Sequence, residues 1–161
     1  MTDRSVRHAT FVIERRYPAE PRRVFAAWAD GEARQIWMDD PDFKSDGTAY
    51  ELEFRVGGHE RFGGQDPDGS TYRCEAFIYD IVPDQRIVYG YEMYAGESRM
   101  SVSLTTVEIA PHPDGAQLTY TEQGAWLDDT DTPEAREGGW KDILGNLDAY
   151  LTAQAARGAH R

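Results

Sequence analysis

Three ionisable side chains of this sequence lie in predicted strands, where acid or base chemistry is possible. Glu122 shares the alternating phase of Leu118 and Tyr120, so it is predicted to face the apolar side of a sheet. A lone carboxylate there is costly unless it is paired, and such burial is how enzymes prepare a general acid or base. Glu75, near an expected bulge, and His59, after a double glycine, are two further candidates.

Each of these candidates also has a purely structural interpretation. Glu122 could form an ion pair with Arg55 or Arg73, or could reach solvent at the end of its strand. Glu75 has the same two alternatives. His59 has no obvious carboxylate partner and fits a surface position at the end of a strand. The sequence therefore supplies candidates for catalysis without assigning a reaction.

Other kinds of catalytic or cofactor site are not indicated. The remaining histidines lie in termini or a turn, so no metal site and no cofactor are predicted. The serines near residue 100 have no elbow motif of the kind that carries a serine nucleophile. Gly57-Gly58 and Gly63-Gly64 lack the strand, glycine loop and helix of a phosphate site, and we interpret them as bends. Cys74, the one cysteine, is predicted to be a buried and inert thiol.

A second group of residues could line a site for an apolar molecule. Tyrosines are frequent among the positions predicted to face inward, and buried hydroxyls need hydrogen-bond partners, which ligand sites often provide. The alternative is that these side chains fill a solid core. The predicted ligand-binding residues are Trp37, Tyr50, Phe54, Tyr89, Tyr91, Met93, Met100, Val102, Leu104, Tyr120, Trp140, Leu144 and Leu147.

The elements that position these residues follow from the periodicity of apolar residues. A first strand is predicted over about residues 9–17, followed by a helix that begins at Pro21 and a second short helix capped by Asp30. Strands alternate over 50–56 and 71–82, the latter with a bulge near Ala76. Further strands follow, and a shift of the apolar phase after Leu104 indicates another bulge.

One long amphipathic helix closes the chain. Thr132 is a good N-cap, and apolar residues recur at helical spacing from Trp140 to Leu151. Gly138 and Gly139 interrupt this helix, which predicts a close backbone approach or a kink. A sheet of about six strands is wider than one helix, so it must curl around it. The predicted fold is α+β: a curved antiparallel sheet around a long C-terminal helix, with two short helices after the first strand.

Composition limits the class of protein. A chain of 161 residues corresponds to one domain, predicted as 1–161 with an ordered core of about 9–152. The net charge of −12 repels phosphate backbones, so no nucleic-acid partner is expected. No signal-type or membrane-spanning segment is found, and membrane insertion is not expected. A cytoplasmic protein, monomeric or weakly dimeric, is predicted.

Several motifs together resemble a known family. They are Arg15 to Pro21 with Trp28 and Trp37, Phe54-Arg55-Val56-Gly57-Gly58, Ile81-Val82-Pro83 with Arg86-Ile87-Val88-Tyr89, and Gly139-Trp140 with Leu144, Leu147 and Leu151. Their order and spacing are similar to those of the SRPBCC (START-like) superfamily, in the branch named after the activator of the heat-shock chaperone ATPase. The resemblance covers residues from about 9 to 152.

The resemblance implies the helix-grip fold with a cavity between the sheet and the C-terminal helix. Members of the superfamily bind lipids and other hydrophobic molecules, and some are polyketide-cyclase-like enzymes. The predicted function is therefore binding of a small hydrophobic or aromatic molecule. A cyclase- or hydrolase-like enzyme that uses a cavity Glu or His is the first alternative. A chaperone-interaction or stress-response module is the second, and an exposed apolar patch on a filled core would favour it.

Overall fold

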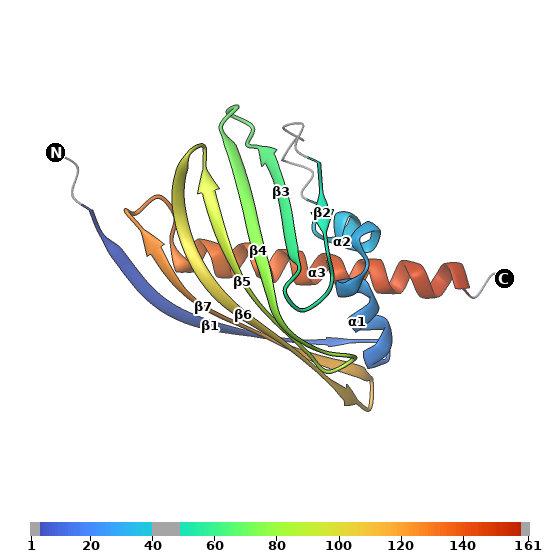
Figure 1. Cartoon of the computed structure of the whole chain (residues 1–161). Helices are drawn as coiled ribbons and strands as arrows, with labels where there is room; N and C mark the ends of the chain where they lie inside the picture. The colour runs from blue at the N-terminus through green and yellow to red at the C-terminus, as the bar shows by residue number, and fades with distance from the viewer. Residues whose placement is uncertain (1–3, 40–48, 159–161) are drawn as a thin grey trace.

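The computed structural model describes residues 4–39 and 49–158, and in this part the chain forms one sheet and three helices (Figure 1). Seven antiparallel strands lie side by side in the order β1-β7-β6-β5-β4-β3-β2. The elements are β1 (Val6–Tyr17), α1 (Pro21–Ala29), α2 (Gly31–Trp37), β2 (Glu51–Leu52), β3 (His59–Gln65), β4 (Thr71–Val82), β5 (Arg86–Ala95), β6 (Ser98–His112), β7 (Gly115–Leu127) and α3 (Pro133–Gly158).

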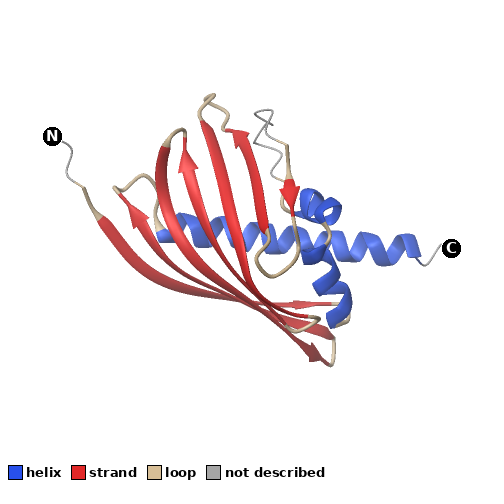
Figure 2. Ribbon diagram, in the orientation of Figure 1, coloured by secondary structure: helices blue, strands red, loops and turns tan. Residues whose placement is uncertain are grey.

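The sheet has an inner face, covered by the helices, and an outer face that no helix of the described residues covers (Figure 2). Strand β1 shows how the sequence sets these faces. Phe11 and Ile13 are buried, whereas Val12 and Glu14 between them are exposed. Because side chains alternate across a strand, this pattern turns one side of β1 toward α3. The predicted α+β fold with a curved sheet and a long C-terminal helix is confirmed.

The two short helices close one end of the sheet. Pro21 occupies the first turn of α1, and the Asp30 side chain accepts a hydrogen bond from the backbone N–H of Glu32 at 3.2 Å at the start of α2. Both helix starts were predicted from these residues. Trp28 and Trp37 then pack edge to face with ring centroids 4.9 Å apart, which fixes α1 against α2.

Helix α3 lies across the inner face and supplies the other half of the core. The Thr132 hydroxyl accepts a hydrogen bond from the backbone N–H of Ala135 at 3.1 Å, so the predicted cap is confirmed. The Tyr17 hydroxyl donates to the carbonyl of Leu144 at 2.9 Å and ties β1 to the middle of the helix. One stripe of α3 is buried against the sheet, and it consists of Arg136, Trp140, Leu144, Leu147 and Leu151.

Several local predictions are corrected by the structure. The predicted strand over residues 50–56 is reduced to Glu51–Leu52, because the chain turns at Gly57, which has a φ of 82°. The bulge of β4 lies between Ile78 and Asp80 rather than near Ala76. No heavy atom lies within 4 Å of where a Cβ of Gly138 or Gly139 would be, so a close backbone approach is not the reason for these glycines.

The inner and outer residues of β6 were assigned in the wrong phase. Val102 and Leu104 are 43% and 42% exposed on the outer face, and Met100 shares their phase. The inner positions are taken by Ser101, Ser103 and Thr105, in the same phase as the buried Val107 and Ile109. No bulge is therefore needed after Leu104, and the register shift lies between Met93 and Tyr94 of β5. The apolar pattern misled here because β6 places polar side chains inside.

A search of the described residues for a helix long and apolar enough to cross a bilayer finds none.

Candidate functional site

Polar side chains of β5, β6 and β7 gather at the middle of the inner face. Ser103 lies opposite Gly124 on β7 and opposite Tyr91 on β5, and Glu122 lies opposite Thr105 in the next row. These rows bring hydroxyls and a carboxylate together below the first turns of α3. We call the group of Tyr91, Ser101, Ser103, Tyr120 and Glu122 the inner polar site.

Glu122 is the centre of the inner polar site, and its side chain has no exposed area. The hydroxyls of Tyr120 and Ser103 donate to Oε1 and Oε2, each at 2.8 Å. The Tyr91 hydroxyl lies 2.7 and 2.8 Å from the two oxygens, and Nη1 of Arg136 lies 3.3 Å from Oε2. The acceptor positions of this carboxylate are engaged, so Glu122 has no free lone pair with which to take a proton from a substrate.

Arg136 extends from the first turn of α3 into the inner polar site. Its Nη1 donates to the Tyr91 hydroxyl at 2.9 Å, and its Nη2 donates to Oγ of Ser101 at 2.8 Å. The same Nη2 lies 3.0 Å from Oδ2 of Asp131, whose side chain is 20% exposed. Arg136 therefore connects the buried carboxylate of Glu122 with a second carboxylate at the surface.

The protonation states in this cluster follow from burial and charge. Burial and then the charge of Glu122 raise the pKa of Tyr91 well above its usual value, and chiefly burial raises that of Tyr120. Both phenols are therefore neutral donors at physiological pH. Burial acts to lower the pKa of Arg136, but Tyr91 and Glu122 more than offset it, so the pKa of Arg136 is raised and the guanidinium keeps its charge.

Two polar groups next to this cluster are buried without a hydrogen-bond partner among the described residues. They are Oγ1 of Thr105, which lies opposite Glu122, and Nε1 of Trp126. The guanidinium of Arg136 lies 5.7 Å from the ring centroid of Trp126. An unpaired buried polar group costs about 1–3 kcal/mol. Such groups call for an explanation, and a bound water or ligand is the common one.

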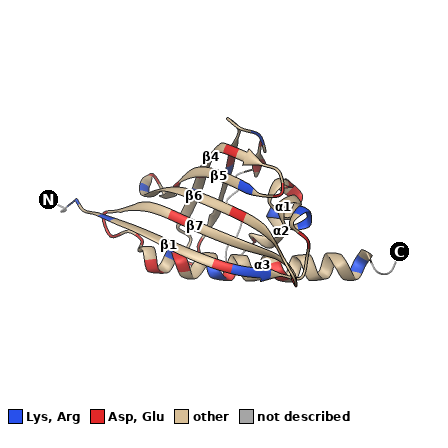
Figure 3. Cartoon of the chain, turned by 90° about the horizontal axis from the view of Figure 1, so that it is seen from below, with Lys and Arg blue, Asp and Glu red and all other residues tan. Residues whose placement is uncertain are grey.

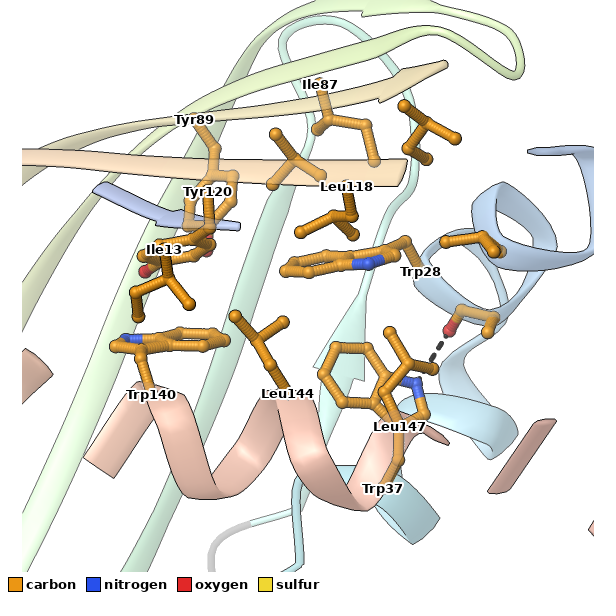
Figure 4. Close-up of a cluster of buried hydrophobic side chains, with 14 of the residues drawn as sticks. Ile13, Trp28, Trp37, Ile87, Tyr89, Leu118, Tyr120, Trp140, Leu144 and Leu147 are labelled. Carbon is orange, nitrogen blue, oxygen red and sulfur yellow. Dashed lines mark hydrogen bonds between the residues drawn. The ribbon is translucent and has the colours of Figure 1, made fainter. Parts of the chain in front are cut away.

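Aromatic side chains pack next to Tyr120 of the inner polar site, on the side of α3 (Figure 4). Trp140 stacks on Tyr120 with ring centroids 4.5 Å apart and on Trp28 at 6.1 Å. Its Nε1 donates to the Tyr91 hydroxyl at 3.3 Å. Tyr120, Leu144 and Leu147 have no exposed area, so they touch no space large enough for a water molecule. The cavity that the resemblance implies is therefore filled by side chains around these residues, and a guest molecule would have to displace them.

A second buried ion pair lies at the other end of the core. Nε of Arg34 lies 2.7 Å from Oε2 of Glu60, and the Tyr50 hydroxyl donates to the same carboxylate. The guanidinium of Arg34 lies 5.0 Å from the ring centroid of Trp28 and 5.5 Å from that of Trp37. We call these five residues the lid cluster, because they join α1 and α2 to β3.

Comparison with known proteins identifies the family of this chain. The model of the family described as "Activator of Hsp90 ATPase homolog 1-like protein" (AHSA1) matches residues 18–152. The chain belongs to the AHSA1 family. No match was found among curated proteins.

Solved structures of AHSA1-like proteins agree with this assignment. An uncharacterised protein from Rhizobium leguminosarum is 42% identical with a TM-score of 0.88, and the alignment covers 94% of this chain and 99% of that one. The Mll3558 protein from Rhizobium loti is 47% identical with a TM-score of 0.83, covering 91% and 99% of the two chains. The AHSA1 protein from Silicibacter pomeroyi, at 20% identity and a TM-score of 0.73 over 91% and 99%, shares the fold.

In this AHSA1-family chain, most of the predicted ligand-binding side chains do meet between the sheet and α3. Those on the inner face or facing it are Trp37, Tyr89, Tyr91, Met93, Tyr120, Trp140, Leu144 and Leu147. Tyr50 belongs to the lid cluster, and Phe54 packs edge to face on Phe25 at 5.7 Å, half-buried beside the core. Val102 and Leu104 do not join them, because they face outward on β6, and Met100 is half-buried at the register shift between β5 and β6.

The three acid–base candidates separate in the structure. Glu122 faces inward as predicted, but its partner is Arg136 and not Arg55 or Arg73. Glu75 forms ion pairs with Arg61 at 3.3 Å and Arg73 at 3.5 Å, away from the inner polar site. His59 has a side chain that is 36% exposed, which fits the surface interpretation, but it does have carboxylate neighbours, with Glu51 at 3.3 Å and Glu53 at 3.4 Å.

The described residues, 4–39 and 49–158, contain no group of three His, Cys, Asp or Glu side chains placed to hold a metal ion.

Three residues in and around the inner polar site were not singled out from the sequence. Ser101 and Ser103 were missed because the phase of β6 was assigned from its apolar residues. Arg136 was missed because it precedes the apolar stripe of α3. It stands four residues before Trp140 and eight before Leu144, so helical spacing places it on the buried face. This spacing is the signal that could have found it.

The outer face carries a groove of its own. It is open to solvent, has a volume of about 800 Å³, and crosses β1, β7, β6, β5 and β4. Gly90 lies between Leu104 and Phe77 in one cross-strand row, and the ring of Tyr79 lies over it, 3.0 Å from where a Cβ would be. The strands around it carry charged residues (Figure 3), and among the residues that line the groove Glu92 is charged. We call this region the outer groove, and its exposed apolar residues are Phe77, Tyr79, Val102 and Leu104.

Proposed function

We propose that this protein binds a small aromatic molecule between the sheet and α3, next to Glu122. The observation that carries the proposal is the inner polar site itself. A carboxylate without exposed area receives donors from Tyr91, Ser103, Tyr120 and Arg136 inside an aromatic core. Apolar walls with a few convergent polar groups are the usual composition of a ligand site.

Stability alone does not account for this arrangement. Replacing a buried ion pair with apolar residues of similar volume is often neutral or stabilising, because the desolvation of two charges offsets their attraction. The unpaired Oγ1 of Thr105 and Nε1 of Trp126 add a further cost. The buried ion pair beside these two groups therefore has a reason other than stability in this proposal, and recognition of a ligand is the reason that we infer.

Binding without catalysis is the form of the proposal that the geometry favours. A general base needs a free lone pair within reach of the substrate, and the contacts of Glu122 occupy its lone pairs. Glu75 lies in ion pairs outside the inner polar site, and His59 lies at the surface beside Glu51. The polar groups of the site therefore orient a molecule in this proposal and do not transform it.

An interaction module is the second candidate, and the outer groove is the observation that favours it. Phe77 and Tyr79 are 50% and 60% exposed there, and exposed apolar surface of this kind often marks a contact site. The groove and the inner site lie on opposite faces of the same sheet. One experiment can therefore discriminate between the two candidates.

The experiment uses 2-naphthalenemethanol as an uncharged aromatic probe and follows methyl groups by NMR in protein labelled at Leu and Val. Leu144 and Leu147 report on the inner site, whereas Val102 and Leu104 report on the outer groove. We expect saturable 1:1 binding with contacts from the naphthalene protons to the inner methyl groups. Contacts to Val102 and Leu104 alone would move the site to the outer groove, and no saturable binding would contradict the proposal.

A further inference from the structure

The groups around the guanidinium of Arg136 form a site for a cation. We propose that the ligand is an aromatic amine or guanidine. Its cation replaces the guanidinium of Arg136 beside Glu122, and Arg136 occupies this position when no ligand is bound. This inference rests on the proposed function, because it names the class of molecule that the inner polar site accepts.

The contacts of the guanidinium identify the charge of the head group. It lies near two carboxylates, with Glu122 at 3.3 Å and Asp131 at 3.0 Å, and it donates to the oxygens of Tyr91 and Ser101. Its centre lies 5.5 Å from the ring of Tyr91 and 5.7 Å from that of Trp126. Carboxylates, hydroxyl oxygens and ring faces all favour a cation, and an anion would meet the charge of Glu122 instead.

Small side chains on the inner face leave room for the head group once Arg136 departs. The inner positions of β6 here are the small residues Ser101 and Ser103, and Gly124 on β7 has no side chain. A Cβ on Gly124 would lie 2.7 Å from Oγ of Ser103 and from the ring of Trp126, so this strand is already at its size limit. The volume filled by the Arg136 side chain is therefore available to the head group, and the aromatic ring of the ligand has to displace neighbouring side chains of the core.

The first turn of α3 has the features that let Arg136 leave. Gly138 and Gly139 follow it, are exposed, and would have no atom within 4 Å of an added Cβ, so packing does not require them. Two glycines in a helix interior weaken it at that point. Asp131 lies at the surface end of the guanidinium and offers a partner to Arg136 after it swings outward. The rest of α3 stays anchored by Trp140 and Leu144.

The first test compares three probes that share one ring system and differ only in the head group. They are 2-naphthylmethylamine, 2-naphthalenemethanol and 2-naphthoate, titrated by isothermal calorimetry. We expect the amine to bind at least tenfold more tightly than the alcohol, because hydrogen bonds to a charged group exceed those to a neutral one by this margin. Naphthoate should bind most weakly. The reverse order would overturn the inference, since Arg136 would then be the group that binds the ligand.

The second test removes the internal cation. In Arg136→Ala the amine should bind roughly tenfold or more tightly than to the unchanged protein, because it no longer displaces Arg136. In the double variant Arg136→Ala, Glu122→Gln this gain should disappear. Equal affinity of the amine for the unchanged protein and Arg136→Ala would overturn the inference.

A third variant leaves every contact of the inner polar site in place, so a change in its affinity cannot be attributed to misfolding of the site. Gly138→Ala with Gly139→Ala stabilises the first turn of α3, so it should weaken binding of the amine several-fold while leaving Glu122 and Arg136 in place. Unchanged affinity in this variant would remove the role of the glycines. If none of the three probes binds to the inner methyl groups, the proposed function fails. If they bind there without a preference for the amine, only the present inference fails.

Discussion

Two arginine–glutamate pairs are buried in the same core, yet they are built differently. The Arg34–Glu60 pair of the lid cluster lies beside the rings of Trp28 and Trp37, and among the described residues its carboxylate has one further donor, Tyr50. The Glu122–Arg136 pair has three hydroxyl donors on the carboxylate in addition to the arginine. The first carboxylate depends on its arginine, whereas the second remains well hydrogen-bonded without it.

This difference indicates which ion pair the fold depends on and which ion pair can exchange its cation. A buried carboxylate left with one donor is an unpaired buried charge. A carboxylate left with three hydroxyl donors is still solvated by the protein. The lid cluster therefore acts as a structural joint between α1, α2 and β3, and the inner polar site tolerates exchange of its cation.

The largest expected effect is the loss of Arg34. Arg34→Ala should lower the free energy of unfolding by about 3–5 kcal/mol, because Glu60 loses its counter-ion. Arg136→Ala should cost less, roughly 1–3 kcal/mol, because Glu122 keeps its hydroxyl donors. Urea unfolding followed by tryptophan fluorescence measures both. Equal losses in the two variants would contradict the contrast between the pairs.

The next effect compares one tyrosine hydroxyl from each cluster. Tyr91→Phe removes a group that contacts Glu122, Arg136 and Trp140, so it should cost about 1.5–3 kcal/mol. Tyr50→Phe removes a hydroxyl that donates to Glu60 from a half-buried position, and about 1 kcal/mol is expected. The same unfolding experiment applies, with Tyr79→Phe on the outer face as the control for a tyrosine hydroxyl outside both clusters. A larger loss for Tyr50→Phe would reverse our view of which network is more connected.

The sequence predicts the helix starts and the inward phase of one strand correctly. Helix starts at Pro21, Asp30 and Thr132 were predicted because a cap depends on a few neighbouring residues. The inward phase of Glu122 was predicted because Leu118 and Tyr120 share it along one regular strand. Local chemistry and simple periodicity were sufficient in both cases.

The parts that failed depend on contacts between distant segments. The partner of Glu122 could not be read from the sequence, because Arg136 lies on α3 and only the packing of α3 on the sheet brings the two together. The phase of β6 failed because the rule that apolar residues face inward does not hold where a strand lines a polar site. A predicted strand over 50–56 failed because Gly57 turns the chain, and alternation alone does not reveal where pairing ends.

A smaller effect tests whether the start of α3, which carries Arg136, unfolds locally more readily than α2. Gly138→Ala and Gly139→Ala should each stabilise the protein by up to about 1 kcal/mol, since both positions are exposed and unhindered. Amide hydrogen exchange should slow in the first two turns of α3 and stay unchanged in α2. Gly124→Ala is the matched control: its Cβ would crowd Ser103 and Trp126, so a loss of roughly 1–3 kcal/mol is expected. Slower exchange in α2 as well would mean that the two ends are coupled.

The smallest effect is expected at the outer groove, and it gives a reference for the stability changes at the two arginine–glutamate pairs. Phe77→Thr and Tyr79→Thr alter only exposed side chains of the outer groove and keep residues that favour strands, so each should change stability by no more than about 0.5 kcal/mol. Binding of the naphthalene probes should also be unchanged, because neither residue reaches the inner face. A loss of probe binding with stability intact would assign recognition to the outer groove. The inner polar site would then be a second structural joint, and the contrast between the two pairs would lie in their stability alone.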